Sequence, residues 1–194
     1  MQCTDKNLLM DYINHNMTEK RRVHTYAVAE EAVKLARRYG EDVEKAELAA
    51  LFHDFFRGIS AEELNRYVRE FGLSPAYFDN NNLAHGKIAA IVMERDYHIT
   101  DQDIINAVSF HTTGRAGMSL LEKIIYLADA IEPNRVYPGV KELRELAMED
   151  LDRACLQSLE KNIEYIRNRG VYLDEDTLKA RDELYKRMKS SHKE

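Results

Sequence analysis

Residues 49–57 read AALFHDFFR, an apolar run that is interrupted by the adjacent pair His53-Asp54 before it ends at Arg57. Its apolar residues continue a spacing that predicts a helix over residues 41–56. Burying an imidazole beside a carboxylate in an apolar helix is costly unless the charges are paired or bound to a metal ion, and aspartate is a poor helix former. A metal-dependent hydrolase is therefore our first hypothesis.

Helical spacing of apolar residues extends along most of the chain, and the three prolines and eight glycines fall mostly where helices should end. The predicted helices span residues 18–38, 41–56, 60–72, 83–95, 101–111, 119–131, 140–148, 151–168 and 176–188. Ser60 and Ser119 begin capping-box patterns, and Thr100 is a candidate cap. No stretch alternates with the period of a strand. The predicted fold class is all-α, a bundle of about eight or nine helices.

The composition limits the class of protein. With 194 residues, 44% of them apolar, the chain is expected to form a single domain over residues 1–194. A net charge of −6 argues against a nucleic-acid partner, and no run approaches the ~18 to 20 apolar residues of a membrane span. Cys3 and Cys155 make no disulfide framework, which favours a reduced, cytoplasmic protein. Apolar residues in the C-terminal helices leave a homodimer open.

Side chains that can bind a metal ion recur along the predicted helices. The six candidates are His24, His53, Asp54, His85, His111 and Asp129. They come from five helical segments or their ends, as a bundle-core site requires, because each helix projects only one or two side chains inward. Six ligands exceed one tetrahedral zinc site, and they suffice for two octahedral ions if one aspartate bridges and waters fill the remaining positions. Iron, manganese, cobalt, nickel and zinc are all compatible with imidazole and carboxylate ligands.

Each candidate has a simpler interpretation when it is taken alone. A lone buried histidine more often bonds a backbone carbonyl than a metal ion, and His53-Asp54 alone is compatible with a polar pair at a helix end. The joint pattern favours a metal site. The remaining histidines lie in polar or charged surroundings, and we assign no role to His15, His98 or His192.

Several segments match the motifs of a known family. They are RRVH at 21–24, AALFHD at 49–54, LAHG at 83–86, HTTGR at 111–115, EKIIYLAD at 122–129 and IEPNR at 131–135. On these segments the chain resembles the HD superfamily of metal-dependent phosphohydrolases, and most closely its YqeK branch of symmetrical diadenosine-tetraphosphate (Ap4A) hydrolases. The likeness runs from about residue 18 to residue 180. It implies an HD-type helical bundle, with a motif core at about 18–135 and C-terminal helices at about 139–190.

The resemblance also implies a two-metal reaction. One ion would be held by His24, His53, Asp54 and Asp129, and Asp54 would bridge to a second ion held by His85 and His111. Iron is the metal most associated with this branch, and the implied reaction is cleavage of Ap4A into two ADP. We hypothesise that a metal-bridging water or hydroxide attacks a central phosphorus, while His53 and Asp54 orient the catalytic cluster.

Other polar side chains near these ligands are candidates to bind the polyphosphate. They are Arg57, Lys87, Thr112, Thr113, Arg115 and Arg135, with Lys123 behind them. The alternative for each basic residue is a solvated surface charge, because the chain has 28 lysines and arginines. Arg57 also departs from the family pattern, in which lysine commonly stands at this position. A guanidinium group can bind phosphate through two hydrogen bonds, whereas lysine acts as a point charge.

Two further functions are compatible with the sequence. An HD phosphohydrolase that acts on a nucleoside tri- or monophosphate, an alarmone or a cyclic dinucleotide would have much the same metal site. A non-catalytic nucleotide-binding regulatory domain of this type usually lacks several ligands, whereas this chain retains all six. Residues 112–115 and 131–135 favour a dinucleoside polyphosphate as the bound partner.

Overall fold

The computed structural model describes residues 3–191, with side chains described for residues 9–190, so His192 and the Cys3 side chain lie outside it. In chain order the elements are α1 (Cys3–Asn16), α2 (Glu19–Tyr39), α3 (Val43–Phe52), α4 (Ala61–Glu70), η1 (Pro75–Tyr77, a 3₁₀ helix), α5 (Asn81–Tyr97), α6 (Gln102–Phe110), α7 (Leu120–Ile131), α8 (Val140–Glu149), α9 (Leu151–Asn168) and α10 (Glu175–Ser191). Residues 3–191 contain no strand, which confirms the predicted all-α class. Their ten α-helices slightly exceed the predicted eight or nine.

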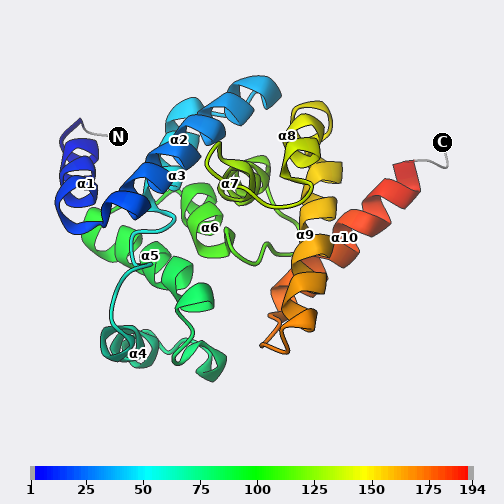
Figure 1. Ribbon diagram of the computed structural model, residues 1–194. Coiled ribbons are helices and arrows are strands. Elements are labelled where there is room, and N and C mark those ends of the chain that lie inside the picture. The colour runs from blue at the N-terminus through cyan, green and yellow to red at the C-terminus, as the bar shows by residue number, and fades with distance from the viewer. Residues whose placement is uncertain (1–2, 192–194) are drawn as a thin grey trace.

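α7 is the central helix of the bundle (Figure 1). Most of its residues are buried, and it packs against α2, α3, α6, α8 and α9. A helix that is buried on all sides places its polar residues in the core as well, and these residues then need hydrogen-bond or metal partners. α7 therefore carries polar groups into the interior of the molecule.

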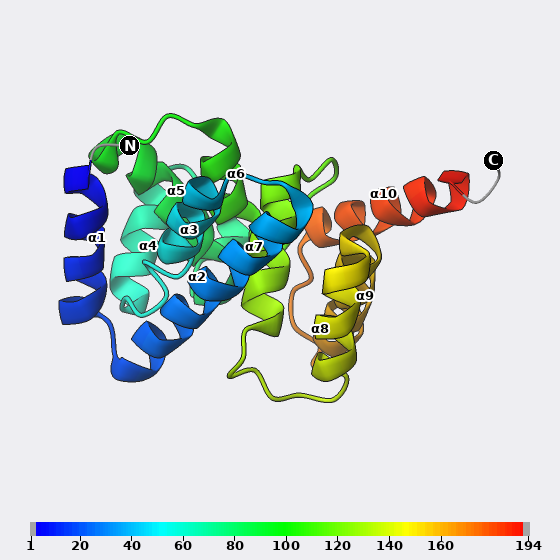
Figure 2. The same cartoon turned by 90° about the horizontal axis from the view of Figure 1, so that it is seen from above.

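The other helices flank α7 on two sides. Helices α1 to α6 lie on one side and α8 to α10 on the other, so that the two ends of the chain lie far apart (Figure 2). The buried apolar side chains nevertheless form one continuous cluster, from Leu9 in α1 to Leu184 in α10. None of the helices formed by the described residues has the length and apolarity that crossing a membrane requires.

Several predicted helix ends are confirmed in detail. Ser119 and Glu122 form a reciprocal capping box at the start of α7, and Gly40 ends α2 with a φ of 76°, a left-handed conformation that glycine adopts without strain. The predicted cap at Thr100 is wrong. Asp101 caps α6 instead, because its carboxylate accepts a hydrogen bond from the amide of Asp103 at 3.0 Å.

The N-terminal helix α1 was not predicted from the sequence. Of its side chains that are described, only Leu9 and Ile13 are fully buried. They stand four residues apart and so face the core from one side of the helix. The surrounding polar residues dilute this signal, which explains why the apolar spacing did not reveal the helix.

Candidate metal centre

The structure brings the six predicted ligands together at the ends of five helices. His24 lies in the second turn of α2, His53 and Asp54 directly follow α3, His85 lies in the second turn of α5, His111 follows α6, and Asp129 lies in the last turn of α7. The four histidines and Asp54 are buried, whereas Asp129 is partly exposed. Such a concentration of buried polar groups is costly unless they satisfy one another or bind an ion.

The six side chains form two groups of three. One group is His24, His53 and Asp129, and the other is Asp54, His85 and His111; within each, the candidate ligand atoms lie within 4.8 Å of one another. In the first group, His24 Nε2 lies 3.1 Å from Asp129 Oδ1. In the second, Nε2 of His85 and Nε2 of His111 are 2.9 Å apart. Each group therefore has the size of a site for a single ion.

Asp54 is the residue that touches both groups. Its Oδ2 atom lies 3.5 Å from Nε2 of His24 and 3.4 Å from Nε2 of His53. Its Oδ1 atom lies 3.1 Å from Nε2 of His85. A carboxylate with one oxygen on each side has the geometry that a bridging ligand needs.

Hydrogen bonds fix the orientation of all four imidazole rings. Nδ1 of His53, His85 and His111 donates to the backbone carbonyls of Ala50, Asn81 and Val108, at 2.6, 2.7 and 2.7 Å. Nδ1 of His24 donates to the carboxylate of Glu132 at 3.1 Å. With the proton on Nδ1, each Nε2 atom presents a lone pair to the centre of the site. This is the usual arrangement of histidines that bind a metal ion.

The positions of the ligand nitrogen atoms indicate that a cation belongs between them. Nε2 atoms of His85 and His111 face each other at 2.9 Å, and those of His24 and His53 at 3.3 Å. When Nδ1 is the donor in both rings, neither Nε2 can donate to the other, and two lone pairs repel at this distance. A metal ion or a proton removes the repulsion. The residues present therefore fit a metal ion in each group.

The electrostatics of the site favour charged carboxylates. Burial opposes ionisation of Asp54, but His53 and His85 outweigh it and hold the pKa of Asp54 well below its usual range. Burial, His85 and His53 together lower the pKa of His111 to about 3. Burial also opposes charge on His53, yet Asp54 raises the pKa of His53 above its usual value. At neutral pH, Asp54 is thus a carboxylate and His111 a neutral imidazole, the forms that bind metal ions.

Two local backbone features shape the site. The predicted helix over residues 41–56 ends early, at Phe52. The His53 ring donates to the carbonyl of Ala50, and the chain continues in tight turns. Asp54 therefore does not lie in a helix interior as expected. On α5, a Cβ atom at Gly86 would come within 2.9 Å of the His111 ring. Glycine at this position allows α5 and α6 to approach until His85 and His111 meet.

The metal centre lies in a cavity of about 1110 Å³. Four arginines line it. Arg21 is hydrogen-bonded to Asp54, Arg135 donates to the carbonyl of Asp129 at 2.9 Å, Arg57 donates to Asn82, and Arg169 donates to the hydroxyl of Tyr165. A guanidinium nitrogen of Arg57 also lies 3.4 Å from Nδ1 of His85. It does not donate to that atom, because Nδ1 carries the proton that His85 donates to the carbonyl of Asn81. Arg57 and Arg135 were predicted. Arg21 was missed, although it precedes His24 by three residues and so shares its helix face.

The other predicted substrate-binding residues divide into two pairs. Thr112 and Thr113 line the cavity, and the Thr112 hydroxyl lies 3.1 Å from Nε2 of His111. Arg115 and Lys87 do not line it. Arg115 makes two hydrogen bonds to the buried carboxylate of Glu122, at 2.7 and 2.6 Å, and the Lys87 ammonium lies 3.2 Å from the centre of the Phe110 ring.

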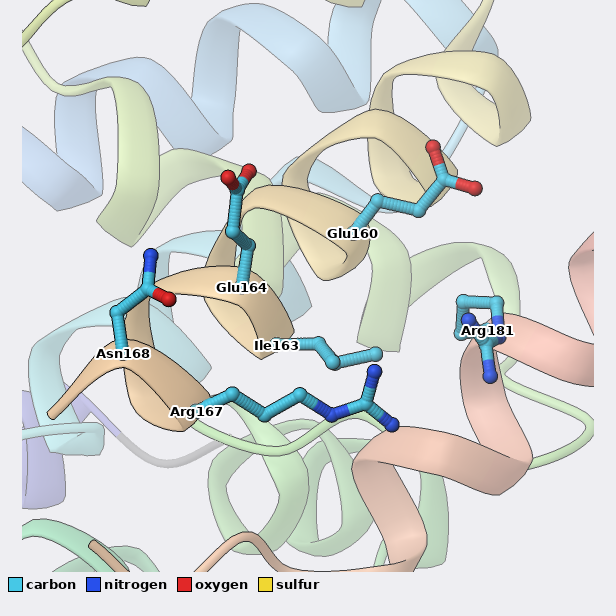
Figure 3. Close-up of a pocket in the computed structure, with 6 residues that line it drawn as sticks. All are labelled: Glu160, Ile163, Glu164, Arg167, Asn168 and Arg181. Carbon is cyan, nitrogen blue, oxygen red and sulfur yellow. The ribbon is translucent and has the colours of Figure 1, made fainter. Parts of the chain in front are cut away.

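A second hollow between α9 and α10 has a different character (Figure 3). Its volume is about 340 Å³. The side chain of Arg167 extends toward Arg181 beside Ile163, while Glu160 and Glu164 lie on the far side of Ile163 from Arg167 (Figure 3). Its lining includes no histidine. It resembles an ordinary charged surface between two helices, in contrast to the cavity that holds the metal centre.

Comparisons with known proteins agree with this geometry. The HD domain family matches residues 21–134. The symmetrical bis(5'-nucleosyl)-tetraphosphatase of Bacillus subtilis is 40% identical over 165 residues, which cover 84% of this chain and 89% of the relative. The protein of the same name from Halalkalibacterium halodurans is 40% identical over 176 residues, covering 90% and 94%.

A solved structure matches almost the whole chain. The crystal structure of a predicted HD superfamily hydrolase involved in NAD metabolism, from Clostridium acetobutylicum, superposes with a TM-score of 0.88 at 41% sequence identity. The match covers 94% of this chain and 97% of the other. The family match extends over more than half of the chain and includes all six candidate ligands. This protein therefore belongs to the HD domain family, in the group that includes the symmetrical bis(5'-nucleosyl)-tetraphosphatases.

Proposed function

We propose that the protein is a metal-dependent phosphohydrolase that cleaves Ap4A symmetrically into two ADP. The observation that carries the proposal is the pair of ligand groups that share Asp54 in a cavity lined by four arginines. The names of the relatives give the substrate class, a bis(5'-nucleosyl) tetraphosphate, and the symmetrical outcome. Addition of one water breaks the central P–O–P link, so that each half leaves as a nucleoside diphosphate.

The proposed ligand sets follow the two groups in the structure. One ion would be held by His24, His53 and Asp129, and the other by His85 and His111, with Asp54 within reach of both. Two ions bound there would supply Lewis-acid activation of water and would neutralise charge on the phosphate oxygens. We propose iron, with manganese, cobalt, nickel and zinc as the alternatives that this ligand set accepts.

The chain's own residues orient this chemistry and hold the substrate. Glu132 and the backbone carbonyls fix the imidazole rings, so that the ligands need little rearrangement when an ion binds. Arg21, Arg57 and Arg135 place positive charge at the rim of the centre, where the non-reacting phosphates of the substrate would lie. Arg57 offers two donors in one plane, which suits phosphate oxygens.

The organisation of the chain fits the same proposal. Residues of about 18–135 supply all six ligands, while the helices of about 139–190 supply the remaining wall of the cavity, including Tyr165 and Arg169. We place the protein in the cytoplasm, where its buried free thiol Cys155 stays reduced and nucleotides are available. A homodimer remains a prediction, for which sedimentation velocity is the test.

Product analysis tests the proposed reaction. The protein is purified without oxygen, its metal content is measured, and Ap4A is supplied with chromatography of the products. Two ADP per substrate support the proposal, whereas ATP plus AMP contradict symmetrical cleavage. Turnover of another nucleotide but not of Ap4A would favour a different HD phosphohydrolase. Tight nucleotide binding without turnover, whatever metal is supplied, would favour the non-catalytic regulatory domain.

A further inference from the structure

Exposed apolar side chains gather in the cavity that holds the metal centre. Eight large apolar residues are exposed within the described part of the chain, and four of them line this one cavity. The four are Phe78, Tyr165, Val171 and Tyr172, which are 36%, 57%, 57% and 51% exposed. Single exposed apolar residues are ordinary on a protein surface, but their concentration around a site indicates a ligand that has an apolar face.

Three of these residues are aromatic, and we call Phe78, Tyr165 and Tyr172 the aromatic wall. They come from separate segments: Phe78 directly follows η1, Tyr165 lies in the last turn of α9, and Tyr172 lies in the connection to α10. An aromatic ring presents a flat face on which any nucleobase can stack. The cavity therefore combines arginines and metal ligands for phosphate with flat apolar surfaces for a base.

A buried hydrogen bond holds the wall in place. The hydroxyl of Tyr77 donates to Asp174 at 3.0 Å, and both side chains are buried. The other oxygen of Asp174 accepts from the amide of Asp176 at 2.9 Å, at the start of α10. This bond ties the segment of Phe78 to the connection that carries Tyr172. The wall is thus a built part of the cavity and not a pair of unattached loops.

Polar groups accompany the aromatic rings. The guanidinium of Arg169 lies 5.4 Å from the centre of the Tyr165 ring and donates to its hydroxyl at 2.5 Å. Asn80, Asn82 and Asn162 also line the cavity and offer both donors and acceptors to the edge of a base. Neutral amides beside aromatic faces suit a nucleobase better than a further phosphate.

We propose that the aromatic wall is a nucleobase subsite, on which one adenine of the substrate stacks while the polyphosphate lies against the arginines. The inference rests on the proposed function, because it assigns a place to the nucleoside part of that substrate. Ligand cavities usually have volumes of about 300–1,000 Å³, so a cavity of about 1110 Å³ has room for more than a phosphate chain. The wall therefore governs substrate affinity and does not take part in bond cleavage.

Fluorescence offers a direct test, because the chain contains no tryptophan. The variant Tyr172→Trp places a single fluorophore in the aromatic wall, and Tyr185→Trp is the matched control. Tyr185 is similarly exposed, at 45%, and lies in α10 outside the cavity. We expect ADP to quench Tyr172→Trp in a saturable way, inorganic tripolyphosphate to leave its emission unchanged, and neither ligand to affect Tyr185→Trp.

Kinetics provide a second measurement that does not depend on the fluorophore. Tyr172→Ala should raise the KM for Ap4A about tenfold, the loss expected from one stacked base, with kcat changed less than about twofold. Tyr185→Ala should change neither constant. An unchanged KM in Tyr172→Ala, or equal quenching of Tyr172→Trp by ADP and tripolyphosphate, would overturn the subsite.

The outcomes separate this inference from the proposed function. Quenching by ADP in a protein that does not hydrolyse Ap4A would support the subsite and refute the function. Hydrolysis of Ap4A without quenching would refute the subsite alone. A third outcome would assign the aromatic wall to contact with a second copy of the chain and overturn the proposal. In that case Tyr172→Ala would lose a dimer that sedimentation detects in the parent, and ADP and tripolyphosphate would affect the fluorescence of Tyr172→Trp equally.

Discussion

The metal centre and the aromatic wall occupy the same cavity but are built in opposite ways. The four histidines are buried, and each ring is fixed by a hydrogen bond from Nδ1. Phe78, Tyr165 and Tyr172 are exposed by a third or more and face open space. Bond cleavage requires ligands held in one geometry, whereas binding a base requires an accessible face. The difference predicts that changes at the centre abolish chemistry and changes at the wall alter affinity.

The largest effect is expected for His53→Ala. His53 is fully buried and belongs to the first ligand group, so its loss removes a ligand that nothing nearby replaces. Turnover should fall by at least about 1,000-fold, together with the metal content. The measurement is elemental analysis with an Ap4A assay. The control is His15→Ala on the exposed face of α1, which should behave as the parent; full metal content in His53→Ala would contradict the assignment.

A smaller effect is expected for Glu132→Ala, which leaves every ligand in place. Glu132 accepts the Nδ1 proton of His24 at 3.1 Å and the amide of Asn134 at 2.6 Å. Loss of such a partner typically weakens metal affinity by about 10- to 100-fold. Competition with a chelator measures the change, and Glu142→Ala on the exposed side of α8 is the control. Unchanged metal affinity would mean that His24 needs no support from Glu132.

The metal centre and the aromatic wall should also differ in how their ligand affinities depend on pH. Burial lowers the pKa of His53, but Asp54 outweighs it, so the pKa of His53 lies above its usual value of 6.5. Below that raised pKa, His53 holds a proton that a metal ion must displace. The metal dissociation constant should therefore begin to rise while the pH is still above 6.5, and then by about tenfold per pH unit.

Quenching of Tyr172→Trp by ADP in the metal-free protein is the comparison for this pH profile. It should stay constant over the same range, because stacking involves no proton. A metal dissociation constant that does not change between pH 8 and pH 6 would show that no ligand competes for a proton in that range, contrary to the raised pKa of His53.

The smallest effect is expected for Arg57→Lys, between the centre and the wall. Arg57 lines the cavity, bonds Asn82 and lies 3.4 Å from Nδ1 of His85, a member of the second ligand group. Lysine keeps the charge but loses the planar pair of donors. The KM for Ap4A should rise about threefold with little change in metal content. A changed ratio of turnover between Ap4A and other nucleotides would show that Arg57 also sets substrate preference.

The metal centre could be predicted from sequence because its residues break local rules. Histidine and aspartate in apolar segments carry a cost that only a partner or an ion offsets, and the six candidates converge in the structure. The directions in which the neighbouring basic side chains point could not be predicted in the same way. Sequence proximity to a ligand segment placed Arg115 and Lys87 near the substrate, but the buried carboxylate of Glu122 and the ring of Phe110 hold them elsewhere.

The aromatic wall and the end of α3 could not be predicted for physical reasons. Tyrosine is an ordinary residue both on a helix surface, as at Tyr165, and in a loop, as at Tyr172. Nothing in the sequence therefore distinguishes these two residues from other surface residues. Only the tertiary fold brings them to one cavity with Phe78. After α3, Phe55 and Phe56 continue the apolar pattern beyond the end of the helix. Both residues lie in turns, and their side chains are buried all the same. The spacing of apolar residues indicates which side chains are buried, and it predicts a helix only as far as the buried residues are helical. Here the buried residues continue past the end of the helix.

Hydrolysis of Ap4A in water enriched in oxygen-18 tests the central claim most directly, namely that water is delivered to the middle of the polyphosphate at this centre. Mass spectrometry of the products should show two ADP per substrate, with one heavy oxygen in the β-phosphate of one of them. His53→Ala should form neither labelled nor unlabelled ADP at a detectable rate. ATP and AMP as products, or undiminished formation of ADP by His53→Ala, would contradict the account.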